Sequence, residues 1–293
     1  MRKSHLQIEG NTIAVYESGG KGAEILLIHG RSMNAQTFRH QLENVFGENH
    51  RVIAFDLPGH GYSSPAVDPE KVYSASGFAR ITAELVNRLA LSSPVIAGWS
   101  LGGGIALDAA DQLSRAAGFF IFGAPPLGNP PAILEAFLPN PAMRLILSQT
   151  LTEGQATAVV ESLLRPGAEL PPSFRKAILK ADGQMRAQLA AGTGNEKRNN
   201  NVETVMNLKV PLAVVHGAED QLVNIDYIRG LEMPTLWRGE VQLIEDAGHS
   251  PHWEQPDRFN VLLADFVKDV TSGVQKPKNY KDRQSMTKYD WEY

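Results

Sequence analysis

Short apolar runs alternate with amphipathic segments along most of the chain, and this alternation limits its possible folds more than any other feature. Most runs are continuously apolar, as strands are when both faces of a parallel sheet are covered. They span residues 12–17, 24–30, 51–56, 94–100, 118–123, 211–217 and 241–246. Apolar residues recur with helical spacing most clearly over residues 37–46, 76–91, 101–113 and 256–270. Repeated strand, helix, strand order predicts an α/β fold with a doubly wound, mostly parallel sheet.

The alternation breaks between residues 124 and 201. Proline-rich joints separate helical stretches there, and Thr152 with Gln155 forms a capping-box signature. Because the strand pattern resumes afterwards, we interpret this segment as an inserted helical cap, with the polar residues 192–201 as its return loop. The chain is thereby divided into a core of residues 1–123 and 202–271, a cap of residues 124–201, and a charged C-terminal tail of residues 272–293.

Composition excludes several kinds of chemistry and partner. The chain has no cysteine, so a thiolate metal site and a cysteine nucleophile are ruled out. A net charge of −4 gives no reason to expect nucleic acid or an anionic membrane as partner. The N-terminal MRKSHLQIEG lacks the apolar stretch of a secretory signal, and no apolar run approaches the roughly 20 residues that span a bilayer. We expect a cytoplasmic protein whose oligomeric state the sequence leaves open.

A single serine stands between glycines where an apolar run meets a helical one. Residues 98–102, Gly-Trp-Ser-Leu-Gly, fit the pattern Gly-x-Ser-x-Gly in the strand, turn, helix context that presents a nucleophile. The glycines leave room for a sharp turn that projects the Ser100 hydroxyl beyond the sheet, next to a helix N-terminus. The alternative is a tight packing corner in which Ser100 only caps the helix.

A nucleophilic serine needs a base, and the base needs an acid to orient it. His249 follows the apolar run 241–246, and Asp220 follows the run 211–217, so both are expected in loops at the carboxyl edge of the sheet. Glu219 is a rival for the acid, and Asp246 a weaker one. Serine, aspartate and histidine arrive in the chain order that this architecture uses. We predict Ser100, Asp220 and His249 as a catalytic triad.

The oxyanion that forms on the attacked carbonyl needs two hydrogen-bond donors. The backbone N–H of Leu101 supplies one, and the loop after the run 24–30 is expected to supply the other, most naturally the N–H of Arg31. We interpret His29 as a structural residue of that loop. Asp56 and His60 could suggest a metal pair, but a tight turn explains them better. Since no metal-ligand spacing occurs, we expect no metal and no cofactor.

Taken together, these motifs resemble the α/β-hydrolase superfamily over roughly residues 10 to 270. The matching pieces are LLIHGRS, FDLPGHGYSS, GWSLGGG, VVHGAEDQLV and DAGHSPHWEQPDRF. Within this superfamily, the chain is most similar to cap-bearing, metal-independent N-acyl-homoserine lactone lactonases. The pieces that carry this likeness are RVIAFDLPGHGYSS followed by AVDPEKVYS, GWSLGGGIAL, FGAPPL and residues 191–194. That family pattern has asparagine after His-Gly and a tyrosine in the cap. Here Arg31 follows His-Gly, and residues 124–201 contain no tyrosine.

The resemblance implies a serine hydrolase that opens a lactone or cleaves a small ester through an acyl-enzyme, most similar in activity to acyl-homoserine lactone ring opening (quorum quenching). The expected partner is thus a small-molecule ester or lactone. A general carboxylesterase and a C–C bond hydrolase are the enzyme alternatives, and a ligand receptor on the hydrolase fold is the non-enzyme one. Apolar cap residues could line an acyl tunnel: Ile133, Leu134, Phe137, Leu138, Met143 and Leu147.

Overall fold

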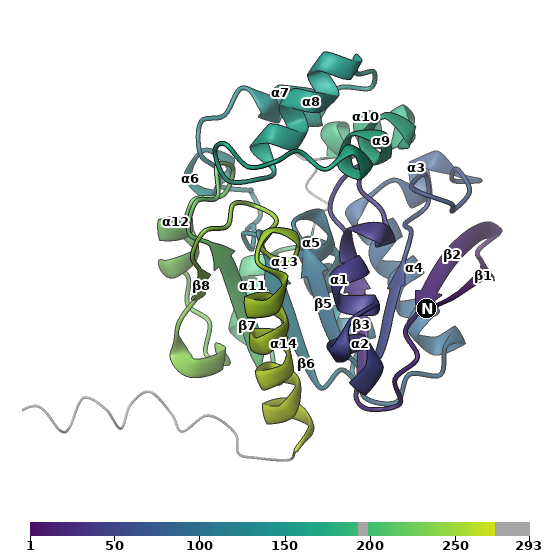
Figure 1. The fold of residues 1–293 in the computed structure, drawn as a ribbon, viewed down its shortest axis with the longest axis vertical. Coiled ribbons are helices and arrows are strands. Elements are labelled where there is room, and N and C mark those ends of the chain that lie inside the picture. The colour runs from purple at the N-terminus through teal and green to yellow at the C-terminus, as the bar shows by residue number, and fades with distance from the viewer. Residues whose placement is uncertain (193–198, 273–293) are drawn as a thin grey trace, which may run out of the picture.

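The sheet has eight strands in the order β1-β2-β4-β3-β5-β6-β7-β8 (Figure 1). A computed structural model describes residues 1–192 and 199–272. The strands are β1 (Arg2–Ile8), β2 (Asn11–Glu17), β3 (Glu24–Ile28), β4 (Arg51–Phe55), β5 (Val95–Trp99), β6 (Gly118–Phe122), β7 (Leu212–Gly217) and β8 (Gln242–Ile244). Strand β2 pairs antiparallel with both β1 and β4, and all pairs among β3 to β8 are parallel. The doubly wound, mostly parallel sheet predicted from the alternation is confirmed.

Chain order reverses between the central strands β3 and β5. From β3 the chain crosses to β4 on one side, and β5 then pairs with β3 on the other, with Ile28 opposite Gly98. In open α/β sheets, ligands bind beyond the carboxyl ends of the strands at such a reversal. The loop after Ile28 and the turn after Trp99 therefore lie side by side at the expected binding edge.

Helices cover both faces of the sheet, and a group of short helices lies beyond its carboxyl edge (Figure 1). One face carries α4 (Ala75–Arg88), α5 (Leu101–Asp108) and α11 (Asn201–Asn207), and the other carries α1 (Arg39–Leu42), α2 (Val45–Asn49), α13 (Pro251–Glu254) and α14 (Pro256–Thr271). Helices α3 (Pro69–Val72) and α12 (Ile225–Arg229) flank the carboxyl edge. Three 3₁₀ turns in the described part of the core lie at Ala35–Phe38, Ala110–Gln112 and Trp237–Gly239.

The interrupted segment forms α6 (Ile133–Ala136), α7 (Ala142–Ile146), α8 (Glu153–Ser162), α9 (Pro172–Lys180) and α10 (Gly183–Gly192), the teal and green helices at the top of Figure 1. We call these five helices the cap helices. The Thr152 hydroxyl accepts from the Gln155 N–H, and the Gln155 side chain accepts from the Thr152 N–H, so the predicted capping box is present. The segment starts and ends at one place, because the Asn201 N–H donates to the Leu127 carbonyl at 2.9 Å. The division of the chain into core and cap stays a prediction.

One strand was missed, and two local expectations were wrong. Strand β1 escaped prediction because its run RKSHLQI is mostly polar and exposed, as an edge strand can be. The helix expected over residues 37–46 is broken into a 3₁₀ turn, α1 and α2, since Asn34 and Asn44 cap new starts. The return loop predicted to reach Asn201 stops earlier, because Asn200 caps α11. Residues 193–198 and 273–293, including Thr193, Gly194 and nearly all of the predicted tail, lie outside the described residues.

No helix in residues 1–192 or 199–272 is both long and apolar enough to cross a membrane.

Candidate active site

The turn between β5 and α5 holds Ser100 in a strained backbone conformation. Its φ of 53° and ψ of −117° lie outside the regions that side-chain-bearing residues normally adopt. The Ser100 N–H donates to the Phe122 carbonyl at 2.9 Å, and its own carbonyl accepts from Gly103 N–H at 3.0 Å. Both bonds fix the turn from the backbone, so the hydroxyl is not needed to hold it. The Ser100 side chain makes no capping hydrogen bond to α5, so the alternative role as a helix cap is not supported.

The flanking glycines are required by close approach of backbone. A Cβ on Gly98 would lie 2.3 Å from the Gly102 carbonyl oxygen, and one on Gly102 would lie 2.1 Å from that of Ile28. Real Cβ atoms do not come so near to backbone, so any side chain would push β3, β5 and α5 apart. The glycines of Gly-x-Ser-x-Gly are thus required because the turn packs closely against β3, β5 and α5.

Two side chains from different loops meet at the same edge of the sheet. Asp220 lies in the loop after β7, and His249 lies between β8 and α13. The His249 Nδ1–H donates to Asp220 Oδ2 at 2.8 Å, and both side chains are almost fully buried. A carboxylate can only accept, so this bond leaves Nε2 of a neutral His249 as an acceptor. His249 and Ser100 line one cavity.

The Asp220 carboxylate is held in its charged form. Burial by itself would raise its pKa, but the neighbouring His249 ring and the Leu222 N–H lower the pKa below the usual range. Its Oδ1 accepts from the backbone N–H groups of Leu222 and Val223 at 2.8 and 3.1 Å. The two rival carboxylates, Glu219 and Asp246, are exposed, and the latter pairs with a surface arginine at 3.4 Å. Of the three candidate carboxylates, Asp220 is therefore the one that contacts His249.

The loop after β3 lies beside the Ser100 turn and carries the second expected donor. Arg31 and Leu101 both line the cavity. Leu101 is the first residue of α5, so its N–H has no acceptor within the helix. His29 holds the loop, donating from Nδ1 to the Gly30 carbonyl at 2.8 Å and accepting at Nε2 from Leu57 N–H at 3.0 Å. Its burial, which lowers its pKa, suits a neutral structural histidine.

Asp56 and His60 also form hydrogen bonds with backbone groups of the loops near the site. Asp56 accepts from the N–H groups of Ala35 at 2.7 Å and Tyr62 at 2.8 Å. His60 Nδ1 donates to the Pro58 carbonyl at 3.0 Å, and its Nε2 accepts from Ser32 N–H at 3.2 Å. With both ring nitrogens engaged, His60 shapes the loop that carries the expected oxyanion donor. These bonds agree with the tight turn that we preferred to a metal pair for Asp56 and His60.

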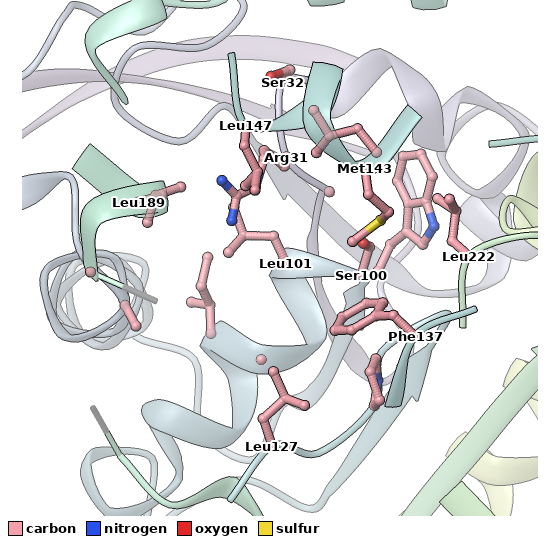
Figure 2. A pocket seen from close by; sticks show the side chains of 18 of the residues that line it. Arg31, Ser32, Ser100, Leu101, Leu127, Phe137, Met143, Leu147, Leu189 and Leu222 are labelled. Carbon is pink, nitrogen blue, oxygen red and sulfur yellow. The ribbon is translucent and has the colours of Figure 1, made fainter. Parts of the chain in front are cut away.

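The cavity above Ser100 has a volume of about 430 Å³ and lies between the sheet edge and the cap helices. Figure 2 shows the Ser100 hydroxyl near its centre, with Met143, Phe137 and Leu222 on one side. The Arg31 guanidinium points into the cavity on the other side, beside Leu147. The lining is mostly apolar, and its polar members include Glu70, Ser74 and Ser76. Such a lining suits a molecule with an apolar body and a few polar atoms.

Four of the six expected tunnel residues line the cavity, namely Ile133, Phe137, Met143 and Leu147. Leu134 does not, because it lies on the outer face of α6 and is 92% exposed. Leu138 does not line it either, and its N–H donates to the Leu222 carbonyl at 2.9 Å. The prediction was wrong for these two because the short helix α6 ends at Ala136, so helical spacing does not continue to Leu138.

Several residues that hold the site escaped the sequence analysis. Arg186, on α10, is buried and donates to four backbone carbonyls, those of Ser148, Gln149, Ile178 and Ala181. Tyr73 donates to Asp182 at 2.6 Å and so ties the core to the start of α10. No motif marks the bonds of Arg186 to Ser148 and Gln149 or that of Tyr73 to Asp182, because they join segments 37 to 109 positions apart in sequence. An arginine within an otherwise helical apolar pattern was the one available signal for Arg186.

The segment that carries His249 is also tied to the cap. Ser250 Oγ donates to the Leu163 carbonyl at 2.7 Å. The Glu254 carboxylate accepts from Gly248 N–H at 2.8 Å and from Arg165 N–H at 2.7 Å, although burial raises its pKa. The candidate base is therefore anchored from both sides of the cavity.

A strained serine turn, a buried histidine–aspartate pair and this sheet order define an α/β hydrolase. The sequence matches the alpha/beta hydrolase family over residues 25–261, and the chain belongs to that family. Its structure is similar to that of the N-acyl homoserine lactonase AidH complexed with N-butanoyl homoserine, with a TM-score of 0.90 and 32% identity, covering 95% of this chain and 100% of that one. A serine-to-glycine mutant of AidH complexed with N-hexanoyl homoserine lactone matches with a TM-score of 0.89 and 32% identity over 93% and 99% of the chains.

A more distant relative matches over most of its length. The pimeloyl–acyl-carrier-protein methyl ester esterase of Nitrosospira multiformis is 23% identical over 269 residues, which are 88% of this chain and 100% of the esterase. The protein is thus a hydrolase of a family with lactonase and esterase members.

Proposed function

We propose that the protein is a serine hydrolase that opens the ring of an N-acyl-homoserine lactone through an acyl-enzyme. Ser100 Oγ attacks the lactone carbonyl while His249 Nε2 takes the hydroxyl proton. The backbone N–H groups of Arg31 and Leu101 stabilise the oxyanion. The ring oxygen leaves as an alkoxide, takes the proton from His249, and stays tethered to the acyl group. His249 then activates water, which releases the opened acid and restores Ser100.

The observation that carries this proposal is the 2.8 Å bond between His249 Nδ1 and Asp220 Oδ2, beside the cavity that Ser100 lines. It supports the proposal because it sets the tautomer in which Nε2 can accept a proton. Asp220 keeps its charge through its low pKa, so it can stabilise the imidazolium that forms during attack.

Two observations favour a lactone with an acyl chain over other esters. The likeness to AidH covers nearly the whole chain, including the cap helices, at 32% identity. The side of the cavity formed by Phe137, Met143 and Leu222 is apolar and suits an aliphatic acyl chain. Removal of such a lactone would be a quorum-quenching reaction. The cytoplasmic location expected from the sequence stays a prediction.

The serine mechanism is tested with a fluorophosphonate probe, which reacts only with an activated serine. We expect labelling of one peptide, that containing Ser100, and no labelling of Ser100→Ala. The Ser148→Ala variant, with a change in the cap, serves as the control and should be labelled like the wild type. An unlabelled wild type, or a labelled Ser100→Ala, would contradict the proposal.

The substrate is tested by comparing N-hexanoyl homoserine lactone with p-nitrophenyl hexanoate at equal acyl length. Ring opening is followed by proton release and by mass spectrometry of the opened acid. We expect a higher kcat/KM for the lactone. Turnover of the p-nitrophenyl ester alone would favour a general carboxylesterase, which the esterase relative supports at the level of the family.

A C–C bond hydrolase and a ligand receptor are the remaining alternatives. Cleavage of a diketone but of neither ester nor lactone would indicate the former. Binding without turnover of any of the three compounds would indicate the latter.

A further inference from the structure

The indole of Trp99 joins the two loops that carry the proposed base and nucleophile. Trp99 is the last residue of β5 and directly precedes Ser100. Its Nε1–H donates to the backbone carbonyl of His249 at 2.7 Å, and the side chain is fully buried. This bond links residues 150 positions apart in sequence. It connects residues 248–250, which we call the base segment, to β5, the strand that leads directly into the turn at Ser100.

The indole cannot turn away from this carbonyl without disturbing its surroundings. Its ring packs against His252 at a centroid distance of 4.7 Å and against Phe174, from the cap helix α9, at 6.2 Å. A Cβ on Gly30, in the oxyanion loop, would lie 3.1 Å from the indole. The His252 ring is fixed in turn, because its Nε2 bonds with Thr37 Oγ1 at 2.8 Å. The packing around the indole therefore holds the N–H of Trp99 in a fixed position.

The other bonds of the base segment come from parts of the molecule that do not carry Ser100. Ser250 reaches the cap at Leu163, and Gly248 bonds with Glu254 in the helix that follows. Asp220 sets the rotation of the imidazole ring. The bond from Trp99 connects the His249 backbone to β5, the strand that leads into Ser100.

We propose that Trp99 is a positioning residue, whose indole N–H holds the His249 backbone in register with the Ser100 turn. This inference rests on the proposed serine mechanism and adds to it the residue that fixes the spacing of nucleophile and base. A displacement of about 1 Å between reacting groups can cost roughly a hundredfold in rate. The hydrogen bond thus serves the spacing of the reacting groups, in addition to satisfying a buried carbonyl.

The test replaces the single N–H and leaves the shape of the side chain unchanged. 3-Benzothienylalanine, an isostere of tryptophan with sulfur in place of the N–H group, is incorporated at position 99 by codon suppression. The matched control carries the same replacement at Trp237, whose Nε1–H donates to Asp269 Oδ2 at 2.9 Å, on the 3₁₀ turn before β8. Both variants lose one largely buried indole hydrogen bond, but only the first loses a bond to the base segment.

We measure the rate of Ser100 labelling by the fluorophosphonate, and kcat and KM for N-hexanoyl homoserine lactone. For the replacement at Trp99 we expect kcat and the labelling rate to fall together, by at least about tenfold, with KM within about twofold of the wild type. The replacement at Trp237 should leave all three unchanged. Rates within about twofold of the wild type for the Trp99 variant would overturn the proposal.

A spectroscopic measurement distinguishes positioning from general loss of structure. We expect the His249 Nδ1–H, bonded to Asp220, to give a downfield proton resonance that disappears in Asp220→Asn. With N–H removed from Trp99, we expect this resonance to broaden through faster exchange with water while the unfolding temperature stays close to that of the Trp237 control. A sharp, unshifted resonance, or failure of the Trp99 variant to fold, would assign Trp99 a purely structural role and overturn the proposal.

The two proposals fail in different ways. An unlabelled wild type overturns the serine mechanism and the positioning role with it. A labelled wild type with an equally reactive Trp99 variant overturns the positioning role alone.

Discussion

The two walls of the cavity are built on opposite principles. The core wall presents polar groups that buried partners hold in place: Asp220 and Trp99 hold His249, and backbone bonds hold the strained Ser100. The cap wall presents mostly apolar side chains, such as that of Phe137, that make no directed bonds to a ligand. Hydrogen bonds fix the positions of reacting atoms, whereas an apolar surface discriminates between ligands by their size and shape. We infer that the core wall sets the chemistry and the cap wall selects the acyl group.

This contrast predicts its largest effect at Asp220. We expect Asp220→Asn to lower kcat about 10⁴-fold, as the same change does in the serine proteases, because an amide favours the wrong imidazole tautomer. Asparagine keeps the acceptor for Leu222 and Val223, so folding should be retained. Steady-state kinetics with N-hexanoyl homoserine lactone measure the change.

Glu219→Gln is the matched control, since Glu219 is the adjacent carboxylate and is exposed. Its kcat should stay within about twofold of the wild type. If Glu219→Gln lowered kcat strongly and Asp220→Asn did not, the orienting acid would have been assigned to the wrong residue.

A smaller effect is expected where the cap is fastened. Arg186→Met leaves the buried carbonyls of Ile178 and Ala181, and the partly buried ones of Ser148 and Gln149, without their donor, which costs about 3 kcal/mol of stability. Because the lost bonds hold the cap segment beside Leu147, which lines the cavity, we expect KM to rise more than kcat falls. Thermal unfolding and steady-state kinetics check both parts.

The control for this prediction is Arg175→Met on α9, whose side chain is 46% exposed and pairs with the exposed Glu153 at 3.4 Å. It should change neither stability nor KM measurably. A fall in kcat at constant KM for Arg186→Met would show that the cap takes part in the chemical step.

Trimming the cap wall should change substrate preference by a still smaller factor. Met143→Ala removes apolar contact from the side of the cavity that we assign to the acyl chain. We expect kcat/KM to fall about tenfold for an octanoyl lactone and less for a butanoyl lactone, because each buried methylene contributes about 0.8 kcal/mol. Leu134→Ala, at the exposed position on α6, should leave both values unchanged. An equal loss for both lactones would place Met143 outside the acyl site.

The smallest effect concerns acid stability. The folded state lowers the pKa of Asp220, so its contribution is present above the unfolded pKa of about 3.9 and is lost as pH falls through the folded value. The unfolding free energy of the wild type should therefore decline more steeply below about pH 4 than that of Asp220→Asn. Urea titrations at a series of pH values measure the two slopes. Parallel slopes would mean that Asp220 titrates alike in both states.

The parts of the core that could be predicted from sequence depend on local rules. Buried strands are continuous apolar runs, and a serine between glycines marks the turn whatever surrounds it. Asp220 and His249 were found because carboxyl ends of parallel strands share one edge, so position along the chain gave position in space. The structure adds the contact between them, which Asp220 makes and its exposed neighbour Glu219 does not.

The cap could be predicted only in outline, because its geometry depends on contacts between distant segments. The Thr152 capping box is local and was found, whereas the bond from Tyr73 to Asp182 spans 109 positions and leaves no trace in either neighbourhood. Strand β1 shows the same limit at the sheet edge, where pairing with β2 outweighs a polar sequence. Trp99 occupies a variable position of the serine motif, so the pattern gives no hint that its side chain reaches the base segment.

The hydrogen bond between Leu127 and Asn201 closes the stem from which the cap helices extend. An insert that leaves and rejoins a protein at one point changes in length at little entropic cost to the remainder, because loop closure depends only weakly on length. We therefore expect that residues 128–200 can be exchanged for the corresponding segment of another family member without unfolding the remainder. Such a chimera would combine the acyl-facing wall of one protein with Ser100, Asp220 and His249 of another.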